Sequence, residues 1–425
     1  MVPTTTAIES TALSNGIRVI TEHVPHVRSI AAGIWVSVGS RRESLEQNGI
    51  SHFIEHMLFK GSQNRTAEEI ARTVDSIGGN LDAFTARELV GFNCKVLDEH
   101  LPIAFDVLSD LVLHPMFREE DVEKEKGVIL EELKMEADSP EYVTHELFCS
   151  NFWKDQALGR PILGTKQTIR RFQRDGLTAF YRSAYSPANI VITAAGNLDH
   201  DQLVRLADDT FGALGAVEQL PPPEDAATCA HISLKSKKSL EQLHLCIGAP
   251  TYPMPHPMRF ASYVLNTVLG GGMSSRLFQN VREKLGLAYS IYSELNLYRD
   301  TGCMAVCAGA STENTRKVVG CILQEFRSLK EDKLPEEELR RAKDHLKGSL
   351  VLSLESTSSR MGNLARQQIF FDRFFTVDEM LDNVEAVDAE QVREVAREFL
   401  RPEELAVAML GNLDGMAVTR DDLAC

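Results

Sequence analysis

Residues 50–59 read ISHFIEHMLF, and this stretch is the strongest indication of both structure and chemistry in the chain. Its apolar residues at positions 50, 53, 54, 57 and 58 follow the spacing of an amphipathic helix. On such a helix His52, Glu55 and His56 project from one side. Two imidazoles one turn apart can bind one Zn²⁺, and a carboxylate between them can reach a metal-bound water. The stretch therefore has the inverted zinc-protease pattern, H-x-x-E-H.

The alternative is a pair of histidines on an ordinary helix that binds no metal. The chain has 12 His and 61 acidic residues among 425, so a random chain of this composition would contain the pattern roughly 0.05 times. The pattern alone therefore favours a metal site but does not establish it.

A second predicted helix, residues 119–137, offers a third ligand. Glu125 and Glu132 stand seven residues apart on one face of it, whereas Glu131 lies on a more polar face. Catalytic zinc takes three protein ligands and keeps one position open, so Glu132 would complete a site with His52 and His56. Glu125 would then orient one of the ligands from behind. The alternative is that these acids only suit the helix dipole.

These motifs resemble the pitrilysin/insulinase family of inverted zinc metallopeptidases, in particular its half-length branch similar to mitochondrial processing peptidase. The spacing of 76 residues between His56 and Glu132 is part of this resemblance. Other matching segments are HFIEHMLFKG at 52–61, GGNLDA at 78–83, VILEE at 128–132, LGGGMSSRLF at 269–278 and VREKLGLAY at 281–289. The resemblance extends over essentially the whole chain.

The resemblance implies one Zn²⁺ per chain and a role for each matching residue. The implied roles are metal ligand for His52, His56 and Glu132, general base for Glu55, support of a ligand for Glu125, and contact with the substrate carbonyl for Arg282 and Tyr289. Taken without the resemblance, Arg282 would be an ordinary helix residue and Tyr289 a packed strand aromatic.

Residues 80–89 follow two glycines and are predicted to form a short strand. The resemblance implies that this strand is a sheet edge that binds the substrate as an additional strand. Its candidate substrate-binding residues are Asn80, Leu81, Asp82, Ala83 and Phe84. The family usually has Asn where this chain has Asp82. An acid there could favour basic substrates, or it could be a plain turn residue.

Strand signals followed by long helical patterns occur in both halves of the chain, which predicts an α+β fold. Helices are expected at 101–113, 174–185, 259–268, 315–329 and 335–354, in addition to 119–137. A Pro-rich linker at 218–228 would separate an N-terminal zinc-binding catalytic domain, 1–217, from a homologous C-terminal domain, 229–425, that carries Arg282 and Tyr289. The resemblance adds antiparallel-rich sheets packed by helices and a clamshell-type dimer.

Composition excludes several other classes of protein. The net charge of −16 disfavours nucleic acid and anionic membranes as partners, because both require basic surfaces. No apolar run reaches the roughly 18 residues that span a bilayer. The start of the chain has no pattern of a signal or transit peptide, so we expect a soluble, cytoplasmic protein. Its eight Cys contain no CxxC pair and are expected to be reduced.

The sequence therefore predicts a zinc endopeptidase that hydrolyses short or unfolded peptides inside a closed chamber. The partners expected are peptide substrates and a second copy of the chain, or a related subunit, with no nucleic acid and no membrane. The alternative is a catalytically silent or presequence-binding subunit of an assembly like processing peptidase or the core proteins. Silent members tend to lose parts of the metal motif, and here all parts are present.

Overall fold

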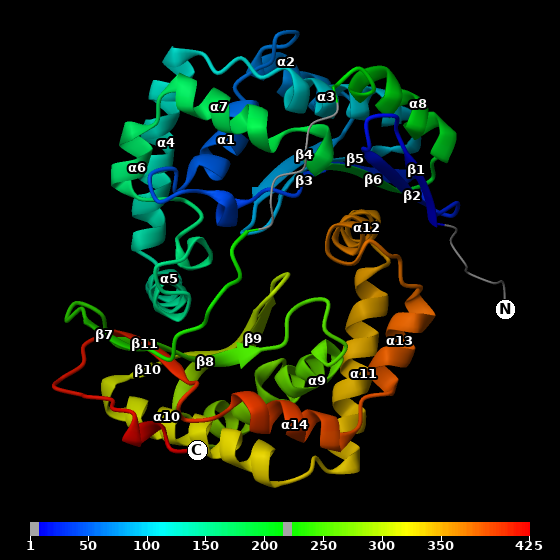
Figure 1. Cartoon of the computed structure of the whole chain (residues 1–425). Coiled ribbons are helices and arrows are strands. Elements are labelled where there is room, and N and C mark those ends of the chain that lie inside the picture. Colours follow the sequence, from blue (N-terminus) through cyan, green and yellow to red (C-terminus); the bar gives the residue numbers. More distant parts are fainter. Residues whose placement is uncertain (1–7, 216–222) are drawn as a thin grey trace. The chain divides into compact units, whose positions relative to one another are not determined.

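The computed structural model describes residues 8–215 and 223–425, which form two compact α+β units (Figure 1). Unit 1 comprises Met1–Leu133, Pro161–Pro223 and Leu352–Phe374 as far as they are described. Unit 2 comprises Lys134–Arg160, Glu224–Val351 and Phe375–Cys425. Each unit has one mixed sheet packed by helices, so the predicted α+β class is confirmed.

The sheet of unit 1 has the strand order β1-β2-β6-β3-β5-β4. The strands are β1 (Ile8–Ala12), β2 (Arg18–His23), β3 (Ser29–Val36), β4 (Asn80–Thr85), β5 (Val90–Leu97) and β6 (Ile190–Gly196). Only the β2–β6 pair of this sheet is parallel. Strand β4 ends the order, so the strand predicted at 80–89 is an edge, although it ends at Thr85 and residues 86–89 form the turn to β5.

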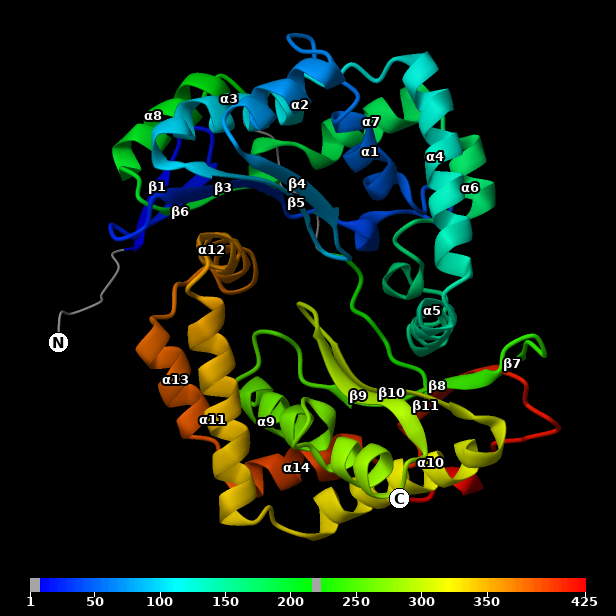
Figure 2. The ribbon, with the colours of Figure 1, turned by 180° about the vertical axis from the view of Figure 1, so that it is seen from behind.

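Helices cover both faces of this sheet. They are α1 (Ile50–Leu58), α2 (Ala67–Ser76), α3 (Leu101–Leu113), most of α4 (Glu119–Ala137), α6 (Lys166–Arg171), α7 (Arg174–Ala184), α8 (His200–Phe211) and α12 (Thr357–Phe371). Helices α1, α3 and α8 lie on one face and α12 on the other (Figures 1 and 2). Thr66 and Glu69 form a capping box at the start of α2, where both the side-chain and backbone hydrogen bonds are present.

The sheet of unit 2 has the order β7-β11-β8-β10-β9. Its strands are β7 (Ile232–Ser236), β8 (Gln242–Thr251), β9 (Ala288–Leu297), β10 (Gly302–Ser311) and β11 (Ala406–Gly411). Its helices are α5 (Pro140–Phe152), α9 (Arg259–Gly270), α10 (Thr312–Glu331), most of α11 (Glu336–Ser353), α13 (Val377–Glu385) and α14 (Ala389–Phe399). Helices α9, α10 and α14 cover one face, and α5 covers the other (Figure 2).

Each unit contains one helix whose neighbours along the chain belong to the other unit, which we call the exchange of α5 and α12. Helix α5 follows α4 in sequence but packs on the sheet of unit 2, where Phe148 and Phe152 join a buried cluster with Ala408 of β11. Helix α12 lies late in the chain but belongs to unit 1. There Met361 packs against Trp35, and the Thr193 hydroxyl donates to the Met361 carbonyl at 3.1 Å. No periodicity in the sequence indicated this exchange.

The predicted division at the 218–228 linker stays a prediction, because residues 218–222 lie outside the described residues. Across the two described ranges, no helix has the length and apolar character that a membrane span requires.

Candidate metal centre

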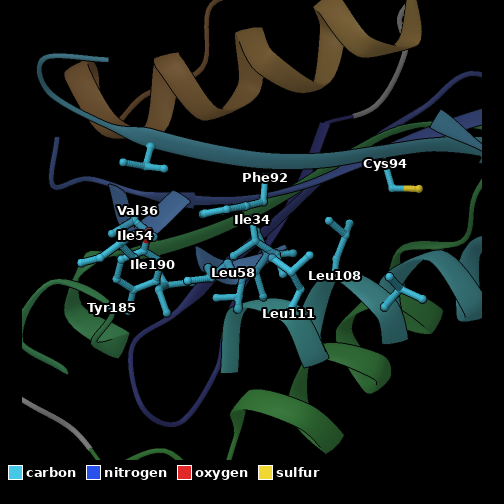
Figure 3. Close-up of a cluster of buried hydrophobic side chains, with 14 of the residues drawn as sticks. Ile34, Val36, Ile54, Leu58, Phe92, Cys94, Leu108, Leu111, Tyr185 and Ile190 are labelled. Atoms are coloured by element: carbon cyan, nitrogen blue, oxygen red, sulfur yellow. The ribbon is translucent and has the colours of Figure 1, made fainter. Parts of the chain in front are cut away.

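Helix α1 is fixed in place because its apolar side packs into the core of unit 1. Phe53, Ile54 and Leu58 are fully buried. Ile54 and Leu58 join the same cluster as Phe92 of the sheet and Leu108 of α3 (Figure 3). Because this packing fixes the rotation of the helix, it also fixes the direction of the polar side chains on its other side.

The three predicted ligands come together in unit 1. Nε2 of His52 and Nε2 of His56 each lie 3.6 Å from Oε2 of Glu132. That distance is too long for a good hydrogen bond. It is close to the roughly 3.4 Å that separates two ligand atoms on a tetrahedral Zn²⁺. Among the described residues, these three form the one group of His, Cys, Asp or Glu side chains arranged to hold a metal ion.

The state of His52 fits a metal ligand. Burial, and then the nearby His56, lowers the pKa of His52 to about 4. Its imidazole is therefore neutral at pH 7, which is the form that binds metal. Its Nδ1 is buried and has no hydrogen-bond partner within the described parts of the chain.

His56 is oriented by Glu125. Nδ1 of His56 lies 2.9 Å from Oε1 of Glu125, and Nζ of Lys60 lies 2.7 Å from Oε2. Burial by itself raises the pKa of Glu125, but the hydrogen bonds from His56 and Lys60 outweigh it, and the pKa is lowered. The carboxylate is therefore ionised and directs Nε2 of His56 towards Glu132. Carboxylates that support metal-binding histidines act in this way. The contribution of Lys60 was not foreseen from the sequence.

Glu55, on the same helix, is held by a residue that the sequence did not single out. The Thr85 hydroxyl, at the end of β4, donates a hydrogen bond to Oε2 of Glu55. Burial raises the pKa of Glu55 above its usual value, which suits a group that accepts and returns a proton. Thr85 lies within the predicted strand 80–89, directly after the candidate substrate-binding residues 80–84, and that position was the available signal.

The start of α1 is capped by a buried acid, Glu43, which was also not foreseen. Its carboxylate accepts the backbone N–H of Gly49 at 2.7 Å and that of Ser51 at 2.9 Å. The side chain of Asn48 donates to it at 3.3 Å. The N-cap residue Gly49 has no side chain that could accept a hydrogen bond from the first N–H groups of the helix. This missing cap was the signal in the sequence that a more distant acid caps the helix.

Arg282 and Tyr289 lie in unit 2, whereas the three candidate ligands lie in unit 1. Arg282 belongs to the π-helical segment Phe278–Lys284 and Tyr289 to β9. The Arg282 guanidinium lies 4.9 Å from the centre of the Tyr289 ring. Tyr289 is 78% exposed, so it is not the packed aromatic that residue type alone suggested. The two side chains form a cation–π pair at the protein surface.

In β4, side chains alternate between two environments. Asn80, Asp82 and Phe84 are exposed, whereas Leu81 and Ala83 pack against the core of unit 1. The side chains of β4 that are open to a peptide added at this edge are therefore those of Asn80, Asp82 and Phe84.

Comparison with known proteins gives consistent matches over both units. The family model "Insulinase (Peptidase family M16)" matches residues 18–166, and "Peptidase M16 inactive domain" matches residues 171–346. The uncharacterized zinc protease YmxG of Bacillus subtilis is 40% identical over 399 residues, which is 93% of this chain and 96% of that protein. An uncharacterized zinc protease of Streptomyces coelicolor is 39% identical over 97% of this chain and 91% of its own.

Solved structures show the same fold. A protease from Helicobacter pylori superposes with a TM-score of 0.88 at 21% identity, covering 95% of this chain and 99% of that one. A chain of complex III2 from Candida albicans gives 0.86 at 19% identity, covering 99% and 100%. The family models and the relatives near 40% identity establish the relationship: the chain belongs to the insulinase family of peptidases, family M16.

Proposed function

We propose that this chain is a zinc-dependent endopeptidase that hydrolyses short or unfolded peptides. The observation that carries the proposal is the group of His52, His56 and Glu132, with Glu55 on the same helix. The match to a peptidase family and the relatives described as zinc proteases support it.

In the proposed reaction, the residues of this chain would have the following roles. Bound zinc would lower the pKa of a coordinated water to about 7 and polarise the substrate carbonyl. Glu55 would accept a proton from the attacking water and return it to the leaving amine. Arg282 and the Tyr289 hydroxyl would stabilise the negative charge that develops on the carbonyl oxygen.

Substrate would bind at the edge strand β4. A sheet edge presents unpaired backbone groups, so it binds an extended chain with little dependence on sequence. A folded domain does not offer such a strand, which is why short or unfolded peptides are the proposed substrates. We further propose that the active form is a dimer enclosing a chamber, as the family resemblance implies.

The rival function is a catalytically silent or presequence-binding subunit. The match of residues 171–346 to a model described as inactive, and the fold shared with a complex III chain, are compatible with it. The complete set of His52, Glu55, His56 and Glu132 favours the enzyme, because a silent subunit has no need of a general base beside a metal site.

The deciding experiment measures zinc content and peptide cleavage on the same samples. The purified protein should bind one zinc per chain and cleave an unstructured peptide library, and a chelator should abolish cleavage. Glu55→Gln should keep the zinc but lose turnover by about 1,000-fold. Glu131→Gln, at an exposed neighbouring position of α4, should leave both unchanged.

Equal cleavage by Glu55→Gln and the wild type would refute the mechanism. Stoichiometric zinc without any cleavage in the wild type would favour the silent subunit.

A further inference from the structure

Unit 2 contains a buried pair of thiols that the proposed chemistry does not use. Cys246 of β8 and Cys307 of β10 stand directly opposite each other in the antiparallel register. Their sulfur atoms lie 2.8 Å apart, inside the roughly 3.5–4 Å of an ordinary contact between heavy atoms. Both cysteines are free thiols, 2% and 7% exposed.

The backbone at this pair already suits a disulfide. Directly opposite residues of antiparallel strands have Cα atoms about 4.5 to 5.5 Å apart. That range lies within the roughly 4.4–6.8 Å that disulfides require. Cys303, the other cysteine of β10, stands opposite Pro250 instead. The geometry therefore selects Cys307 as the partner of Cys246.

A small recess borders the pair. The recess has a volume of about 20 Å³ and is lined by both cysteines, together with His244, Ser290 and Tyr292. All its lining residues belong to unit 2. A volume of about 20 Å³ has room for about one molecule of the size of water. The pair is thus shielded from large reagents.

We propose that Cys246 and Cys307 are a redox-sensitive pair that a hydroperoxide converts into a cross-strand disulfide. This inference is independent of the proposed peptidase activity, because it concerns other residues in the other unit.

The reaction with hydrogen peroxide balances in two steps. The Cys307 sulfur attacks a peroxide oxygen, so that an S–O bond forms, the O–O bond breaks, and the thiol proton leaves with the other oxygen as water. The Cys246 sulfur then attacks the sulfenic sulfur, an S–S bond forms, and a second water leaves. The two sulfurs lose two electrons and the peroxide gains them.

Cys307 is the first to react because it is the more exposed of the two. The neighbouring Cys307 thiol and burial raise the pKa of Cys246, so Cys246 stays protonated at neutral pH. It acts as the second, resolving thiol once the sulfenic acid stands beside it.

The test treats the purified full-length protein with a small excess of hydrogen peroxide and measures its intact mass. One disulfide lowers the mass by about 2 Da per chain, and dithiothreitol should restore it. Tryptic digestion without reductant should then link residues 239–259, which contain Cys246, to residues 300–316.

The second fragment contains both Cys303 and Cys307, so a matched variant is needed. Cys303→Ala should lose about 2 Da as readily as the wild type and give the same link, now assignable to Cys307 alone. Cys246→Ala should instead gain about 16 or 32 Da as Cys307 is oxidised alone.

The wild type and Cys303→Ala decide the question even if Cys246→Ala does not fold. The proposal is wrong if the wild type shows no loss of about 2 Da, or if the link joins Cys149 or Cys303 instead.

Discussion

The hydroxyl of Thr85 donates a hydrogen bond to Oε2 of Glu55 and so connects the last residue of the edge strand β4 to helix α1. The strand proposed to bind substrate and the helix that carries the candidate base are therefore joined through side chains as well as packing. Glu55 is fixed at one oxygen, which leaves the other free to approach a water molecule.

Replacement of Thr85 by Val should reduce kcat about 10- to 100-fold, because Glu55 loses the hydrogen bond that orients it. Zinc content should not change, since the Thr85 hydroxyl bonds to Glu55, which is not one of the candidate ligands. Thr85→Ser keeps the hydroxyl and should retain most of the activity. A Val variant with wild-type kcat on a fluorogenic peptide would show that the bond is incidental.

Glu125→Gln should weaken zinc binding about 10- to 100-fold, because His56 loses the charged partner that orients it. Competition with a chromogenic chelator measures this affinity directly. Glu123→Gln is the matched control, since Glu123 lies on the same helix, is exposed, and pairs with Lys126 rather than with a candidate ligand. If the two variants bind zinc equally well, Glu125 does not support the site.

Glu43 should make the stability of unit 1 depend on pH. Burial raises its pKa from 4.5 to about 7, so the folded protein holds this proton more tightly than the unfolded chain. Its stabilising contribution is complete below pH 4.5 and is lost as the pH rises to about 7. The free energy of unfolding should fall over this range by about 3 kcal/mol relative to Glu43→Gln, which has no such proton to lose.

The chain has two tryptophans, Trp35 in unit 1 and Trp153 in unit 2, which makes this measurement specific. In a Trp153→Phe background with chelator present, Trp35 fluorescence reports the urea unfolding of unit 1 alone. If the free energy of unfolding changes with pH in the same way with and without the Glu43→Gln substitution, the pKa of Glu43 is not raised.

Sequence patterns predicted the elements that local periodicity determines. The helices at 101–113 and 119–137 have the predicted bounds, and the strand predicted from residue 80 begins at Asn80. The exchange of α5 and α12 was not predictable in this way, because an amphipathic helix does not encode which sheet it covers. The same limit applies to the site: the H-x-x-E-H pattern is local, but Glu43 and Thr85 reach α1 only through the tertiary fold.

The proposed dimer predicts complementation between two inactive variants. If zinc comes from one protomer and Arg282 from the other, a mixture of Glu55→Gln and Arg282→Ala under subunit exchange creates one intact site per mixed dimer. Random exchange makes about half of the dimers mixed, so activity should recover to about a quarter of the wild-type level. A mixture that stays inactive would show that Arg282 acts within its own chain.

Substrate preference should follow from the edge strand and its charge. Unstructured peptides should be cleaved at least about 100-fold faster than a stable folded domain, since only they can extend along β4. Asp82 is exposed on that strand and the net charge is −16, so basic peptides should be favoured, and less so as salt is added. A preference for acidic peptides at low salt, or rapid digestion of the folded domain, would contradict this.

The exchange of α5 and α12 has a consequence for synthesis on the ribosome. Unit 1 contains the candidate metal centre, yet one face of its sheet is covered by residues 357–371, which are among the last to emerge. Until then Trp35, Ile20 and Val191 have no helix to pack against, and a nascent sheet with an apolar face is prone to aggregation. Unit 1 with both faces of its sheet covered is therefore completed only late in synthesis, and a nonsense mutation anywhere before residue 357 removes a helix of this unit.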